Sequence, residues 1–257
     1  MEKLSYMTCK DLTFRNVYQQ ISQYRYADFY SSKQCKPMNE EHKMELDNRY
    51  GCPFMNEIFY DMVICENRIP THIDFIDYYK RLYCDKSGNG MLRFNKNAME
   101  RGRKSNKNFN YTFEETYLNG KLMRAYMSFL KELYVLAWLW EHGMYSAYWS
   151  FKDDTEVGFD IRVSSFNGYE ERKYGIKIYA ATKNAKKKAE IKANQRHKEY
   201  PDITSISLIS VLSREGSTKL GDTYLFDNSI LNGMLNYIRN TVPGNLIIER
   251  KEEIKLC

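Results

Sequence analysis

The hydrophobic pattern of the chain is most distinctive where two short segments alternate apolar and polar side chains. The first, VGFDIRV at residues 157–163, directs its apolar residues to one face of an extended strand and Asp160 to the other. The second, YGIKIYAA at residues 174–181, alternates in the same way and places Lys177 opposite its more apolar face. A polar turn separates the two segments, so the pattern predicts a β-hairpin. If each strand buries its apolar face, Asp160 and Lys177 share the exposed side.

Helical periodicity surrounds this hairpin. Residues 113–142 predict a long helix whose second half is apolar almost all round, which indicates burial. Residues 183–199 predict a strongly basic helix, in which alanines spaced at four would let a narrow face lie close to a sheet. The other predicted elements in this half are strands at 144–151, 203–212, 221–226 and 245–248 and a helix at 230–238.

The chain before residue 113 has a different pattern. Apolar residues at spacings of three and four predict helices at 14–21, 55–65 and 70–83. The fold class predicted for the whole chain is therefore α/β. Residues 113–257 would form a mixed β-sheet flanked by helices, and residues 1–112 a mainly helical N-terminal region with a basic linker.

Glu132 interrupts the apolar half of the long helix. Its neighbours three and four positions away are Ser128, Phe129, Val135 and Leu136, none of which can be an ion partner. A buried carboxylate is costly unless it is paired, so Glu132 needs a partner from another element. Two alternatives stay open: Glu132 pairs with a lysine or arginine across the fold, or it lies near the surface.

An aspartate and a lysine on adjacent strands, beside a basic helix, can hold a divalent metal and a phosphodiester together. The order of helix, GFDIRV strand, YGIKIYA strand, basic helix and strand resembles the PD-(D/E)XK, or restriction-endonuclease-like, nuclease superfamily over about residues 114–211. The resemblance implies an endonuclease-like core that uses Mg²⁺ or Mn²⁺. It also implies Asp160 and Glu132 as metal ligands and Asp160, Lys177 and Glu132 as catalytic residues.

The chain departs from the family pattern two residues before the lysine. That position usually carries Glu, Asp or Gln, and here it is Gly175. Asp153, Asp154, Glu156 or Glu171 could supply the missing carboxylate, in which case restoring Glu at position 175 is expected to raise metal affinity. The alternatives are a catalytically inactive copy of the fold, or an ordinary hairpin with a solvated Asp and Lys.

Charge is concentrated in two segments. Residues 172–198 hold ten basic residues against Glu190 and residues 93–107 hold six against Glu100, which leaves a balance of −8 for the rest of a chain whose net charge is +6. Such a distribution is typical of a protein that binds a polyanion. The candidate nucleic-acid-binding residues are Lys183, Lys186, Lys187, Lys188, Lys192, Arg196, Arg101, Arg103 and Lys104. A solvated helix face and an interdomain linker explain the same residues without a ligand.

Several other classes of protein are disfavoured. The six cysteines are scattered without a CxxC pair and have no ligand spacing relative to the four histidines, so a zinc site is not expected. We find no membrane span, signal peptide, glycine-rich phosphate loop or nucleophile elbow, and we expect a cytoplasmic protein without a membrane partner.

The function predicted from the sequence is metal-dependent hydrolysis of DNA phosphodiester bonds, with double-stranded DNA as the expected substrate. The family implies a setting in restriction, phage defence or a mobile element, and leaves open a homodimer or a partner subunit. The alternative is a non-catalytic member of the same fold that binds nucleic acid or a partner protein. A third hypothesis makes the helical N-terminal half, rich in Tyr and Met, an interaction surface.

Overall fold

The computed structural model describes residues 6–7, 12–23, 55–83, 111–166, 169–179, 185–209, 217–220, 223–240, 246–248 and 254–256. The chain divides into two units, one formed by Met1–Tyr24 with Leu130–Cys257 and the other by Arg25–Phe129. Helix α7 (Tyr111–Glu141) contributes its residues up to 129 to the second unit and the rest to the first. The division predicted between residues 112 and 113 therefore does not coincide with the division between units.

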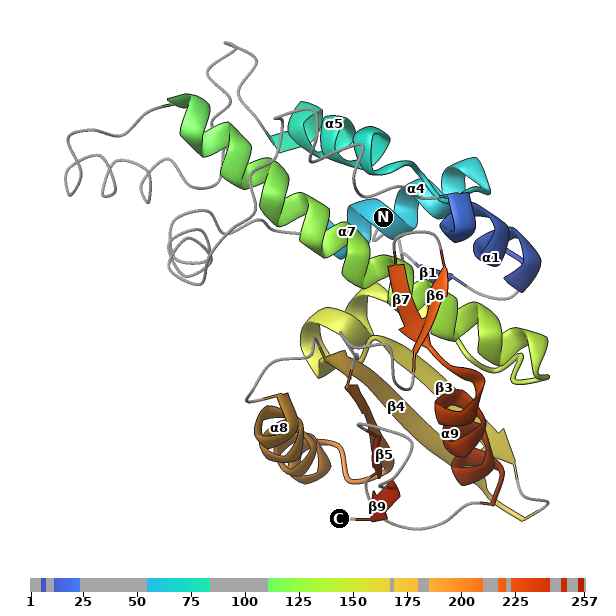
Figure 1. Cartoon of the computed structure of the whole chain (residues 1–257). Helices are drawn as coiled ribbons and strands as arrows, with labels where there is room; N and C mark the ends of the chain where they lie inside the picture. The colour runs from blue at the N-terminus through green and yellow to red at the C-terminus, as the bar shows by residue number, and fades with distance from the viewer. Residues whose placement is uncertain are drawn as a thin grey trace. The chain divides into compact units, whose positions relative to one another are not determined.

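The first unit is built on a five-stranded mixed sheet of order β3-β4-β5-β8-β9 (Figure 1). Its strands are β3 (Ile161–Phe166), β4 (Glu171–Tyr179), β5 (Ile203–Ile209), β8 (Leu246–Ile248) and β9 (Ile254–Leu256). Strand β4 is antiparallel to β3 and parallel to β5, and β5 is parallel to β8. The α/β class with a mixed sheet, predicted from the sequence, is confirmed.

Two helices cover opposite faces of this sheet. Helix α8 (Ala185–Glu199) connects β4 to β5, and its buried Ala189 packs with Ile209 and Tyr179. Helix α9 (Asn228–Asn240) packs on the other face, where Tyr174 Oη donates to the Ile238 carbonyl oxygen at 3.3 Å. Because Tyr174 and Tyr179 are an odd number of positions apart on β4, they point to opposite faces. The alanine face predicted for the basic helix is therefore confirmed at Ala189.

The predicted hairpin forms, but its first strand begins later than expected. Strands β3 and β4 pair with Ile161 opposite Ile176 and Arg162 opposite Gly175, which puts Asp160 and Lys177 on one side, as predicted. Residues Asp153–Val157 form the short π-helix η2 instead of leading directly into the strand. The Gly158 amide donates to the Asp153 carbonyl oxygen at 2.7 Å, and the left-handed φ of +81° at Gly158 ends the helix.

The strand predicted at 144–151 is also much shorter than expected. Only β2 (Trp149–Ser150) forms, paired with β1 (Tyr6–Met7). Gly143, with φ +84°, lies at the end of α7, and the Met144 amide bonds back to the Leu139 carbonyl oxygen. Residues 142–146 therefore close the helix in successive turns, and only Tyr148, which forms an antiparallel bridge with Arg162, extends the pairing ahead of β2. The unit also contains α1 (Phe14–Gln23) and the hairpin of β6 (Ser217–Leu220) and β7 (Thr223–Phe226).

The second unit is helical within its described part, as predicted. Helices α4 (Met55–Glu66) and α5 (His72–Tyr83) and the first part of α7 enclose an aromatic core. The Phe59 ring contacts Tyr60, Phe75, Tyr126 and Phe129 at centroid distances of 5.2 to 6.0 Å. Helix α5 begins after Thr71, whose Oγ1 accepts from the Asp74 amide at 3.1 Å while Asp74 accepts from the Thr71 amide. This reciprocal cap fixes the start of the helix.

Candidate active site

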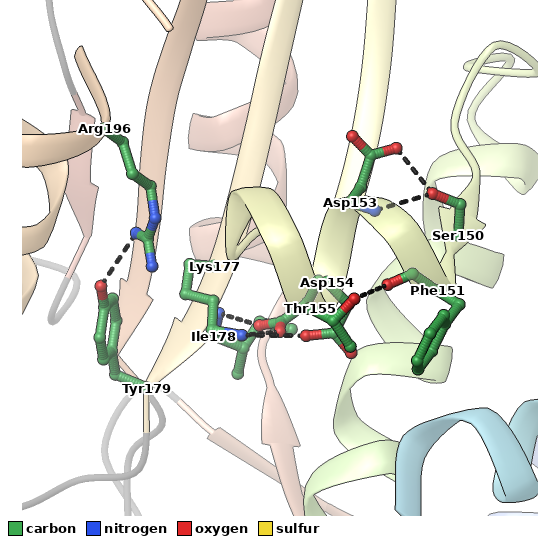
Figure 2. Close-up of polar contacts among 10 residues, drawn as sticks. Ser150, Phe151, Asp153, Asp154, Thr155, Lys177, Ile178, Tyr179 and Arg196 are labelled. Carbon is green, nitrogen blue, oxygen red and sulfur yellow. Dashed lines mark hydrogen bonds and ion pairs between the residues drawn. The ribbon is translucent and has the colours of Figure 1, made fainter. Parts of the chain in front are cut away.

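Lys177 is the centre of a cluster of acidic side chains in the first unit. It lies on β4, and its Nζ forms a direct ion pair with Asp160 Oδ1. The same ammonium lies 3.4 Å from Asp154 Oδ1, so two carboxylates from different elements meet at one lysine (Figure 2). All three side chains are largely shielded, with 23% of the Lys177 side chain, 12% of Asp154 and 2% of Asp160 exposed.

Asp160 is fixed from both its main chain and its side chain. Its amide donates to the Ile176 carbonyl oxygen at 2.9 Å, and its Oδ2 accepts from the Ile178 amide at 2.6 Å. The backbone of β4 therefore orients the carboxylate before any ligand arrives. The expectation that Asp160 lies on an exposed hairpin face is wrong, because η2 covers that end of the hairpin and brings Asp154 over it.

Three acids of η2 were candidates for the carboxylate missing at Gly175, and only Asp154 faces Lys177. Asp153 is held elsewhere, since its Oδ2 accepts from Ser150 Oγ at 2.7 Å and its Oδ1 lies 3.7 Å from Arg162 Nη1. Glu156 is exposed, and so is Glu171 at the far end of β4. The π-helical turn thus selects Asp154 by directing consecutive side chains to different sides.

Glu132 lies on the part of α7 that belongs to the same unit and is 5% exposed. Its negative charge contributes to raising the pKa of Lys177, which places it within electrostatic reach of the cluster. The sequence left open whether Glu132 is buried or near the surface, and the structure answers that it is buried. Glu132 is the third carboxylate that acts on Lys177, after Asp160 and Asp154.

Burial and charge set the protonation of the cluster. Burial lowers the pKa of Lys177, but the charges of Asp160, Asp154 and Glu132 raise it, and the net direction is upward. The ammonium therefore stays protonated at any physiological pH. Burial also raises the pKa of Asp160 to about 6, helped by Asp154 and opposed by Lys177 and the Ile178 amide. Perturbed pairs of this kind are frequent at functional sites.

Gly175 is explained by packing rather than by metal chemistry. It lies on the same face of β4 as Lys177, where a Cβ would come within 2.5 Å of the Phe159 ring. Phe159 is completely buried and fills the space that a larger residue at position 175 would need. The expectation that Glu at this position would restore a ligand is therefore corrected, since its side chain has no room beside Phe159.

The donor set around Lys177 can be compared with the needs of a metal. Within the part of the chain that the structure describes, no group of three or more His, Cys, Asp or Glu side chains is arranged to hold a metal ion. Mg²⁺ is commonly held by only one or two carboxylates, with water and substrate phosphate completing its shell. Asp154 and Asp160, which approach one ammonium from two sides, fit that smaller requirement.

The predicted nucleic-acid-binding residues fall into three groups. Lys187, Lys188 and Lys192 are exposed on α8, and Lys186 is half-buried. Arg196 does not cover the outer side of the helix as expected, because it is buried against the sheet with 8% of its surface exposed. Lys183, Arg101, Arg103 and Lys104 lie outside the described residues. The sequence named Arg196 as a candidate but did not predict its burial, because α8 lies on the sheet with a wider face than its alanines mark.

Comparison with known proteins adds no family: no protein-family model, no curated protein and no solved structure matches the chain. The resemblance to the PD-(D/E)XK superfamily stays a prediction, carried by the two short motifs around Asp160 and Lys177. None of the helices in the described ranges is long and apolar enough to span a lipid bilayer.

Proposed function

We propose that this protein is a metal-dependent nuclease that hydrolyses DNA phosphodiester bonds. The observation that carries the proposal is the convergence of Asp154 and Asp160 on the Lys177 ammonium, with Glu132 close enough to raise its pKa. These four residues come from α7, η2, the position just before β3, and β4, so the fold, not a local sequence run, assembles them.

Each residue of the cluster has a role that its surroundings support. Asp160 and Asp154 would hold Mg²⁺ or Mn²⁺, and the bound cation supplies Lewis acidity at the phosphate and a more acidic water. Glu132 adds negative charge on the α7 side. Lys177, which keeps its proton, would orient the attacking water or stabilise negative charge on the phosphate oxygens. Exposed lysines on α8 would draw the nucleic acid toward this face.

The arrangement of β3, β4, α8 and β5 supports a restriction-endonuclease-like core as part of the same proposal. An antiparallel hairpin is followed by a helical crossover to a parallel strand, in the order that the resemblance implies. The aspartate and the lysine lie on facing positions of that hairpin.

A second candidate function is nucleic-acid binding without catalysis. Both oxygens of Asp160 already have partners, Lys177 for one and the Ile178 amide for the other. If this closed ion pair does not open for a metal, the same residues stabilise the hairpin and only the basic surface acts. The two candidate functions differ in one observable: the nuclease cuts a substrate, and the binding protein cuts none.

The test of the proposal is a substrate panel. Supercoiled plasmid, linear duplex, single-stranded DNA and RNA are incubated with the purified protein in Mg²⁺, in Mn²⁺ and in EDTA. Cleavage of DNA with either metal and none in EDTA supports the nuclease. Binding of DNA without cleavage in any condition supports the second candidate instead.

Asp154 offers a prediction with a matched control on the same short helix. Asp154→Asn should lower the cleavage rate about 10- to 100-fold, the range expected when a metal site loses a supporting carboxylate. Glu156→Gln makes the same chemical change two residues away on an exposed side chain and should leave the rate unchanged. Single-turnover rates at saturating Mg²⁺ compare the two, and equal rates for both variants would remove Asp154 from the site.

The pKa of Asp160 gives a second prediction. A carboxyl group must lose its proton to bind a metal, and in the metal-free protein the pKa of Asp160 is raised to about 6. The Mg²⁺ concentration for half-maximal cleavage should therefore rise about tenfold for each pH unit below about 6 and change little above about 7. Titrations of Mg²⁺ across this range measure it, and a constant requirement would contradict the assignment.

A further inference from the structure

Arg196 is a buried arginine that the proposed cleavage chemistry leaves without a role. It lies in the last turn of α8 with 8% of its surface exposed. Its Nη1 donates to Tyr179 Oη at 3.2 Å (Figure 2). Its guanidinium carbon also lies over the Phe159 ring, 5.1 Å from the ring centroid. An arginine in this position is held by an aromatic ring and a hydroxyl, neither of which neutralises its charge.

A second arginine on the same ring shows the contrast. The Arg162 guanidinium lies 5.8 Å from the Phe159 centroid and has Asp153 Oδ1 at 3.7 Å as a partner. Among the residues that the structure describes, no carboxylate forms an ion pair with Arg196. A guanidinium has five N–H donors, and only one of those of Arg196 donates to a described acceptor. A buried charge without an ion partner is costly unless a ligand neutralises it.

Tyr179 extends the donor group toward the candidate active site. Its hydroxyl oxygen accepts from Arg196, so the hydroxyl hydrogen can be donated to a third group. Tyr179 is two positions from Lys177 on β4, which puts the two side chains on one face and about 7 Å apart along the strand. Tyr179 and the Arg196 guanidinium bonded to it therefore lie on the Lys177 side of the sheet.

Gly158 leaves the space that this arrangement needs. A Cβ at this position would lie 3.2 Å from Arg196 Nη2 and 3.3 Å from Nε. The residue also has a left-handed φ of +81°, which favours glycine. The Nε–Nη2 edge of the guanidinium therefore packs against the backbone of the turn that ends η2, and the Nη groups beside Tyr179 are the donors left for a ligand.

We propose that Arg196 and Tyr179 form a phosphate-binding site beside Lys177. A phosphate group presents several acceptor oxygens, which suit the remaining Nη donors of the guanidinium and a hydroxyl donor together, and its charge neutralises the arginine. The identity of the ligand rests on the proposed function: it is a backbone phosphate of the nucleic acid next to the one that is cut. Inorganic phosphate or a mononucleotide offers the same group from solution.

Oligonucleotide binding in EDTA tests this site without any cleavage. Arg196→Met should weaken the affinity of a fluorescein-labelled oligonucleotide about 10- to 100-fold, and Tyr179→Phe about 3- to 10-fold, as expected for lost hydrogen bonds to a charged group. The matched control is Lys198→Met, which removes the same charge from an exposed residue in the same turn and should change affinity less than about threefold.

Inorganic phosphate and a mononucleotide are added as competitors. If they displace the oligonucleotide from the wild type but not from Arg196→Met, the site accepts free phosphate, and if they do not, it is specific for the nucleic-acid chain.

Thermal unfolding separates a ligand site from a structural arginine. Since Met can pack on Phe159 without burying a charge, Arg196→Met should unfold at or above the wild-type temperature. A lower unfolding temperature together with unchanged affinity would overturn the site. If Arg196→Met does not fold, normal affinity of Tyr179→Phe would overturn it. If both variants bind more weakly but the wild-type protein never cuts DNA, the proposed hydrolysis is wrong and the phosphate site stands. If the wild-type protein cuts DNA and both variants bind normally, the phosphate site is wrong and the hydrolysis stands.

Discussion

Replacing Asp160 with asparagine is expected to lower the rate of DNA cleavage about 1000-fold, because the change removes a ligand charge at the position where charge develops. The asparagine oxygen can still accept from the Ile178 amide, and Lys177 keeps Asp154 as a partner. The fold should therefore survive, with an unfolding temperature close to that of the wild type. Single-turnover cleavage of a labelled duplex gives the rate, and thermal unfolding gives the control for folding.

Lys177→Met should produce a loss of similar size, since it removes the fixed cation from the same cluster and keeps an unbranched side chain. Glu171→Gln is the matched control, because Glu171 is an exposed carboxylate on the same hairpin. It should cut at the wild-type rate. If Asp160→Asn or Lys177→Met did the same, the cluster would have no part in catalysis.

Substitution of Gly175 is expected to have the largest effect on stability. An alanine Cβ would lie 2.5 Å from atoms of the Phe159 ring, well inside van der Waals contact. Gly175→Ala should therefore lower the free energy of unfolding by roughly 1–3 kcal/mol, the usual cost of overpacking. Gly175→Glu should cost more, because it also buries a carboxylate. Urea unfolding of the three proteins measures both effects.

The same clash predicts that substitutions at positions 159 and 175 have coupled effects on stability. Shortening the ring residue in Phe159→Leu makes room at position 175, so the double variant should be more stable than the sum of the single effects predicts. Additive effects, or a Gly175→Ala protein as stable as the wild type, would contradict the packing explanation. In that case the glycine at position 175 would need a functional reason.

Alternation along the strands was enough to predict the central part of the fold. Two short segments with an apolar face gave the hairpin, and the same alternation placed Asp160 and Lys177 on one side, as the ion pair between them confirms. The sequence identifies Glu132 as unusual because it interrupts the apolar half of a helix. That apolar half is buried, so Glu132 is buried with it and lies within electrostatic reach of Lys177. Periodicity is informative at these positions because the direction of each side chain depends on which face of its strand or helix is buried.

Other features depend on contacts that periodicity does not encode. The π-helix at residues 153–157 requires backbone bonds over five residues and a left-handed glycine, and it decides that Asp154, not Glu156, reaches Lys177. The burial of Arg196 follows from a ring on a different element, Phe159, and from the room left at Gly158. In the sequence, Asp154 and Arg196 both appear as ordinary members of charged segments.

We propose that the carboxylates around Lys177 support metal-dependent cleavage of DNA, and removal and return of the metal tests this most directly. Supercoiled plasmid is incubated with wild-type protein that has been dialysed against EDTA, and then with the same protein after Mg²⁺ or Mn²⁺ is added in excess. We expect no cleavage in EDTA, full recovery with the metal, and no recovery for Asp160→Asn prepared in parallel. Plasmid that stays intact in every condition, or that is cut equally by wild type and Asp160→Asn, would contradict it.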